Sequence, residues 1–172
     1  MTIEELYDSK GFYYFCTDKK THHSYLPIYS ELFAKWEKEP IRILEVGVYK
    51  LGSLRLMEEY FVNAEIIGVD NTTYEGSVPL NRAQVIIEDF YSSNRELPPL
   101  HIAIDDGPHD VASQLAFVRK VYPKMVSGGI LVVEDVMPGF KEHFDSLGLP
   151  YTAIAFYPPT DQADDRLILI RK

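Results

Sequence analysis

Two acidic segments and one histidine are the residues of this chain whose types and spacing could do chemistry. Asp105-Asp106 comes directly after the apolar run 100–104 and is followed by His109. Glu134-Asp135 comes directly after the apolar run 130–133. Because adjacent strands lie about 4.8 Å apart, carboxylates that follow two neighbouring strands can share one cation. A histidine beside them, with an ordinary pKa of about 6.5, can accept a proton near neutral pH.

The chain pattern predicts a sheet that brings these segments together. Apolar runs suited to burial on both faces alternate with segments of helical spacing, which predicts an α/β fold: a Rossmann-like, doubly wound, mostly parallel seven-stranded sheet. The expected strands are 41–46, 65–70, 83–88, 100–105, 130–134, 151–156 and 166–170, and the expected helices between them include 52–61, 110–125 and 139–147. The connection 157–165 is too short for a crossover helix, so the last two strands should form an antiparallel pair. Ligands of such sheets bind beyond the carboxyl ends of the strands.

We expect one domain over residues 1–172, with an aromatic-rich cap or lid at 1–40 and the Rossmann-like core at 41–172. A short helix is expected at 2–7, with Thr2 as its N-cap and Glu5 three residues later, and another at 25–38 before Pro40. Two interpretations of this segment stay open. Its aromatic residues could cover one face of the sheet, or the loop 17–24 could close over a ligand.

Charge and composition argue against several classes of protein. The 172 residues include 17 basic and 26 acidic ones, for a net charge of −9, whereas nucleic acids and anionic membranes attract clustered positive charge. No apolar run approaches the roughly 20 residues of a membrane span, and the N-terminus lacks the basic start of a signal peptide. Cys16 is the only cysteine, which fits a reducing compartment. We therefore expect a cytoplasmic protein.

Three further signals sit at strand ends. Glu45-x-Gly47 follows the first strand, and a glycine there lets the backbone pass close to a ligand. Asp70 ends the second strand, where an acid commonly accepts hydrogen bonds from the ribose of an adenosine ligand. Asp89 follows the third strand and could meet an adenine amino group. Asp70 and Asp89 could also be simple turn formers.

The segments 41–70, 104–109 and 128–135 resemble class I S-adenosylmethionine-dependent methyltransferases. More narrowly, the Asp-Asp-Gly-x-His and Glu-Asp motifs resemble the macrolide sugar O-methyltransferases of the tylosin and mycinamicin type. Thr17-Asp18-Lys19 and His23-Ser24-Tyr25 resemble an upstream segment of that group. The resemblance implies S-adenosyl-L-methionine as methyl donor, Mg²⁺, and a small hydroxylated substrate.

The same resemblance assigns roles to residues. Asp106, Glu134 and Asp135 would be the metal ligands, and His109, supported by Asp106, would be the general base. The expected contacts to the methyl donor are Glu45, Gly47, Asp70, Asp89, Asp105, Lys19 and Tyr25.

The predicted function is therefore methylation of a hydroxyl on a sugar or another small polyol. One alternative is a donor-binding protein that does not methylate, for example a regulatory subunit. Another is a nicotinamide dehydrogenase, against which stand the absent G-x-G-x-x-G motif and the antiparallel last strands. The aromatic residues of the first 40 positions fit either a lid or an interface of a homo-oligomer.

Overall fold

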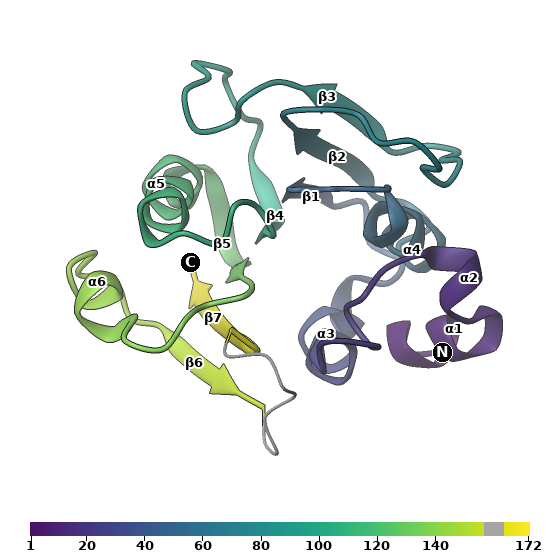
Figure 1. Ribbon diagram of the computed structural model, residues 1–172, viewed down its shortest axis with the longest axis horizontal. Helices are drawn as coiled ribbons and strands as arrows, with labels where there is room; N and C mark the ends of the chain where they lie inside the picture. Colours follow the sequence, from purple (N-terminus) through teal and green to yellow (C-terminus); the bar gives the residue numbers. More distant parts are fainter. Residues whose placement is uncertain (157–163) are drawn as a thin grey trace.

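The computed structural model describes residues 1–156 and 164–172, which form a seven-stranded sheet in the order β3-β2-β1-β4-β5-β7-β6 (Figure 1). The strands are β1 (Arg42–Val46), β2 (Glu65–Asp70), β3 (Gln84–Ile87), β4 (Leu100–Asp105), β5 (Met125–Val133), β6 (Thr152–Ala155) and β7 (Arg166–Arg171). β1 to β5 are parallel, and β7 runs antiparallel to both β5 and β6. This confirms the predicted fold class. Most of the connection between β6 and β7, residues 157–163, lies outside the described part.

Helices lie on both sides of this sheet, as Figure 1 shows. On one side are α1 (Ile3–Lys10), α2 (Phe12–Phe15), α3 (Tyr25–Phe33) and α4 (Gly52–Tyr60), and on the other are α5 (Val111–Val121) and α6 (Lys141–Asp145). Successive strand residues point to opposite faces, so the buried strands contribute side chains to two cores. The first core lies on the side of α1 to α4, and the second lies on the side of α5 and α6. Ile43 and Ile102 face the core with α3 and α4, whereas Leu44 and Ala103 face the core with α5.

The N-terminal segment is part of the first core. Thr2 and Glu5 form the expected capping box at the start of α1. Tyr29 and Phe33 of α3 are fully buried, and Phe33 packs against Phe61 beyond α4. Most of the aromatic residues therefore do cover one face of the sheet, whereas Phe12 and Tyr13 are exposed. None of the helices in the described residues is long and apolar enough to cross a membrane.

Several elements differ from the expected bounds, among them the helix before β5 and β5 itself. The helix expected at 110–125 ends at Val121, and a 3-10 turn with Pro123 follows, because proline lacks the N–H that an α-helix needs. β5 then begins at Met125, so that Gly128 and Gly129 lie inside the strand instead of forming a turn before it. Gly128 has a φ of +77°, and the register of β4 against β5 shifts in this region. Both features are those of a β-bulge, which accommodates extra residues within a strand.

Candidate active site

The two acidic segments meet at the carboxyl edge of the sheet. Asp105 of β4 lies opposite Val133 of β5, and β4 also pairs with β1. The hydrogen-bond ladder continues one residue beyond the strands, because the Glu134 N–H donates to the Asp105 carbonyl over 2.9 Å. The Asp106 N–H likewise donates to the Val46 carbonyl over 2.8 Å. The topology alone thus fixes the two acidic segments side by side.

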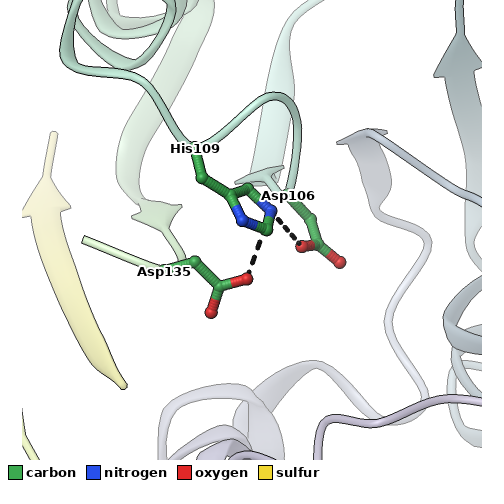
Figure 2. Close-up of side chains that lie close together, drawn as sticks. All are labelled: Asp106, His109 and Asp135. Carbon is green, nitrogen blue, oxygen red and sulfur yellow. Dashed lines mark ion pairs between the residues drawn. The ribbon is translucent and has the colours of Figure 1, made fainter. Parts of the chain in front are cut away.

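Asp106, His109 and Asp135 converge at this edge (Figure 2). Their ligand atoms all lie within 4.8 Å of one another, the spacing at which one metal ion can be held. The imidazole lies between the two carboxylates, with Nε2 3.5 Å from Asp106 Oδ1 and 3.2 Å from Asp135 Oδ2. His109 and Asp135 both have left-handed backbone conformations, with φ of 59° and 52°, which are uncommon outside glycine.

Charge and burial act on each member of this group. The hydrogen bond to Asp106 raises the pKa of His109, and the Asp135 charge adds to that effect against the influence of burial. Burial raises the pKa of Asp135, while the Tyr25 hydroxyl, which donates to Asp135 Oδ1 over 2.5 Å, opposes that rise. Burial also acts to raise the pKa of Asp106, but Lys19 and His109 together outweigh it and the pKa is lowered.

Glu134, a predicted metal ligand, points away from that group. Both of its carboxylate oxygens accept hydrogen bonds from the Lys19 ammonium, over 2.8 and 2.6 Å. The Tyr29 hydroxyl also donates to it. The Glu134 side chain is buried beneath the sheet edge, so the structure groups Asp106 and Asp135 with His109 and leaves Glu134 with Lys19 and Tyr29.

Three predicted donor contacts, Lys19, Tyr25 and Glu45, are also buried, and none of them lines either of the two cavities described below. Glu45 Oε2 accepts a hydrogen bond from the Ser53 hydroxyl over 2.7 Å, which ties β1 to α4. These residues support the site from below in this structure, because Lys19 pairs with Glu45 and the Tyr25 hydroxyl donates to Asp135.

A cavity of about 560 Å³ lies beside the ends of β1, β2 and β4, and three predicted donor contacts line it: Gly47, Asp70 and Asp89. Asp70 Oδ2 accepts the N–H groups of Val48 and Tyr49, over 2.9 and 3.1 Å, and so holds the turn after β1. Asp70 is therefore both a turn-holding residue and part of a cavity wall. Asp89 accepts a hydrogen bond from the Ser92 hydroxyl over 2.7 Å.

A second cavity, of about 370 Å³, lies on the other side of the turn after β1. It shares Gly47, Tyr49 and Asp106 with the first cavity, and His109 and Asp135 line only this second one. Its outer wall comes from the N-terminal segment: Phe12, Cys16, Thr17, Asp18 and His22. The loop 17–24 therefore does border a ligand-sized space, in addition to the packing role of its neighbours.

Three tyrosines that sequence reasoning did not select, Tyr49, Tyr74 and Tyr91, line the first cavity. The Tyr49 and Tyr74 rings lie 4.7 Å apart, edge to face. The Tyr91 hydroxyl donates to Asp105 Oδ1 over 2.8 Å. Asp105 itself is only 2% exposed and does not line the cavity, and burial raises its pKa to about 7. Asp105 thus reaches the cavity wall through Tyr91.

Comparisons with known proteins agree with this geometry. No family model matches the chain. The 8-demethyl-8-(2-methoxy-alpha-L-rhamnosyl)-tetracenomycin-C 3'-O-methyltransferase of Streptomyces olivaceus is 31% identical over 130 residues, which cover 69% of this chain and 33% of that protein. The mycinamicin VI 2''-O-methyltransferase of Micromonospora griseorubida is 30% identical over 140 residues, which cover 72% of this chain and 35% of that protein. The matched part of the chain thus spans about a third of the length of these curated relatives.

A solved structure shares the whole fold. The MycE methyltransferase of the mycinamycin biosynthetic pathway, in complex with Mg, SAH and mycinamycin VI, superposes with a TM-score of 0.76 at 22% identity, covering 100% of this chain and 54% of that one. The chain therefore has the fold of the class I S-adenosylmethionine-dependent methyltransferases. Its sequence relatives are the antibiotic sugar O-methyltransferases, which confirms the resemblance found in its motifs.

Proposed function

We propose that the chain supplies the methyl-transfer site of an S-adenosylmethionine-dependent, Mg²⁺-dependent O-methyltransferase that acts on a hydroxyl of a sugar or another small polyol. The observation that supports this most is the pair of cavities that meet at Gly47, Tyr49 and Asp106. One cavity has the acids suited to an adenosine ligand, and the other has the histidine and carboxylates suited to a hydroxyl. Relatives that methylate sugar hydroxyls support the same assignment.

The first cavity is proposed to hold the methyl donor, which supplies an already activated methyl group when bound. A volume of about 560 Å³ is ordinary for a cofactor site. Asp70 and Asp89 offer carboxylate acceptors for ribose and adenine, and Gly47 brings the turn after β1 against the Asp106 backbone, where a Cβ atom would not fit. The rings of Tyr49 and Tyr74 form an apolar part of the wall.

The residues present fit a divalent cation at Asp106 and Asp135. Mg²⁺ prefers oxygen ligands, and these two carboxylates come from adjacent strand ends and converge with His109 within 4.8 Å. When bound, the ion would supply positive charge that lowers the pKa of an acceptor hydroxyl. Glu134, the third predicted ligand, could join the set only after leaving Lys19 and Tyr29.

His109 is proposed to take the proton of the acceptor hydroxyl. Its imidazole, at 39%, is the most exposed of the three side chains, and it lines the second cavity. Asp106 and Asp135 on either side fix its orientation and favour the protonated form that follows proton transfer. The side chains of the N-terminal segment would hold the acceptor and keep water away from the transfer.

The direct test is a transfer assay with S-adenosylmethionine and a panel of free sugars, polyols and glycosylated antibiotics, run with Mg²⁺ and again with excess chelator. We expect methyl transfer only with the metal, and binding of S-adenosylhomocysteine in both conditions by calorimetry. Binding without transfer to any acceptor would favour the regulatory alternative, and a thermal shift with NAD would favour the dehydrogenase. A homo-oligomer and a cytoplasmic location stay predictions.

A further inference from the structure

Lys19 is the buried cation of the site. It lies in the loop between α2 and α3, its residue is 1% exposed, and its ammonium faces three carboxylates from three strand ends. The distances from Nζ are 2.8 Å to Asp106 Oδ2, 2.6 Å to Glu134 Oε2 and 3.3 Å to Glu45 Oε1. The ammonium donates hydrogen bonds to Asp106 and to both oxygens of Glu134, and its contact with Glu45 is an ion pair.

The carboxylates around Lys19 are the kind of ligand set that a hard divalent cation prefers. The second oxygen of Glu45, Oε1, is buried and has no hydrogen-bond partner among the described residues other than its ion pair with Lys19. The buried carboxylates of Glu45 and Glu134, together with the half-buried Asp106, would be costly without a counter-charge, because they lose hydration. A cation is therefore required at this position, and Lys19 provides one covalently.

The ammonium also determines which oxygens remain free. It engages Asp106 through Oδ2, which leaves Oδ1 on the side of His109 and the second cavity. It engages both oxygens of Glu134, which keeps that side chain away from Asp135. Lys19 thus separates an inner cation position, which it fills, from the outer position between Asp106 and Asp135.

We propose that Lys19 is a tethered counter-ion that occupies an internal divalent-cation position formed by Glu45, Asp106 and Glu134, and thereby confines a bound metal ion to the outer pair Asp106 and Asp135. Lys19 is a positioning residue in this arrangement, since it acts through the carboxylates. The inference deepens the proposed function and rests on its cation site, but it does not depend on methyl transfer. Removing the ammonium should convert the internal position into a metal site.

The test is Mn²⁺ binding to Lys19→Met, followed by electron paramagnetic resonance and by thermal unfolding, without donor or acceptor. Without metal, we expect the melting temperature to fall by roughly 10 °C, because buried carboxylates lose their counter-ion. We expect Mn²⁺ to restore it and to bind about tenfold or more tightly than to the wild type, because a positive charge has left the site. Lys20→Met is the matched control, since Lys20 pairs with Asp8 and Glu4 away from the site and should leave both readouts unchanged.

A second variant locates the new metal position. Lys19→Met combined with Glu134→Gln removes one partner of the internal position, and the gain in Mn²⁺ affinity should disappear. Equal or weaker Mn²⁺ binding by Lys19→Met would overturn the proposal, as would a double variant that keeps the full gain. If Lys19→Met is unfolded without metal, Mn²⁺ should restore its circular dichroism spectrum, and failure at saturating Mn²⁺ would also overturn the proposal. Failure of methyl transfer leaves these readouts untouched, so the two proposals can fail separately.

Discussion

The backbone of Gly47 lies directly against the carbonyl of Asp106. A Cβ atom on Gly47 would come within 1.8 Å of the Asp106 oxygen, and the glycine has a φ of +84°. The turn after β1 and the corner after β4 can therefore approach this closely only with a hydrogen as the side chain. Both cavities meet at this contact, so its spacing sets the distance between them.

The first prediction concerns this contact. Gly47→Ala should lower the free energy of unfolding by about 2–4 kcal/mol, through the unfavourable φ and the forced displacement of the Asp106 backbone. It should also weaken binding of S-adenosylhomocysteine. Gly76→Ala is the matched control, because Gly76 also has a positive φ, of +74°, but a Cβ atom added there would meet no other atom within 4 Å. Urea unfolding and calorimetry check both variants; equal losses would mean that backbone strain alone matters.

The second prediction concerns Asp70. Asp70→Asn removes the charge that holds the Val48 and Tyr49 N–H groups and that faces the first cavity. Hydrogen bonds to a charged group contribute about 1.5–3 kcal/mol, so affinity for S-adenosylhomocysteine should fall by about tenfold or more. Asp145→Asn, at an exposed carboxylate on α6, should leave the affinity unchanged. Unchanged calorimetric affinity in Asp70→Asn would remove Asp70 from the donor site.

The third prediction concerns the proposed base. His109→Asn should reduce the rate of methyl transfer by about 10²–10⁴-fold, the usual contribution of a positioned general base, and should leave donor binding intact. Asp135→Ala should abolish turnover with the same retention of donor binding. His143→Asn, on the exposed face of α6, serves as the control. A His109→Asn enzyme with wild-type kcat would assign proton removal to another group.

The fourth prediction concerns stability and pH at Glu58, a buried residue of α4. Burial acts to raise its pKa, but the N–H groups of Asn81, Arg82 and Ala83 outweigh burial and hold the pKa below its usual value. A lowered pKa means that the ionised form stabilises the folded state above the unfolded pKa of about 4.3, and that this contribution is lost as the pH falls through the folded value.

Glu58→Gln should therefore lower the free energy of unfolding by about 1–3 kcal/mol near neutral pH, and this difference should shrink below about pH 4. Urea unfolding of wild type and variant across that range measures it. Glu65→Gln removes an exposed ion pair with Arg42 and should have a much smaller effect. A difference for Glu58→Gln that does not change with pH would exclude ionisation as its origin.

Much of the fold could be predicted from the sequence because its strands are continuous apolar runs. The runs that end at Asp70 and Asp105 mark parallel strands buried on both faces, and their ends are the ends of β2 and β4. The short connection after residue 156 predicted the antiparallel pairing of β6 and β7. α2 escaped prediction because four residues are too short to show a helical period.

The site was predictable at the level of strand ends, but the partners of most of its side chains were not. That Asp105 and Asp106 point in opposite directions follows from the alternation of a strand, and they do contact Tyr91 and Lys19 respectively. The partners of Lys19 depend on where the loop 16–24 folds back, and no local pattern encodes that position. Tyr49 and Tyr74 were not predicted as cavity residues for the same reason, because each lies in a turn whose position depends on tertiary contacts.

The two cavities draw their separate walls from different stretches of the chain. The outer wall of the second comes from residues 12–22, before the first strand, whereas the first is walled by residues 46–113. In the proposed arrangement, exchanging the N-terminal segment would change which acceptor is bound and would leave the proposed donor cavity unchanged. Lys19 limits that freedom, because any replacement segment has to bring a lysine back to the same three carboxylates.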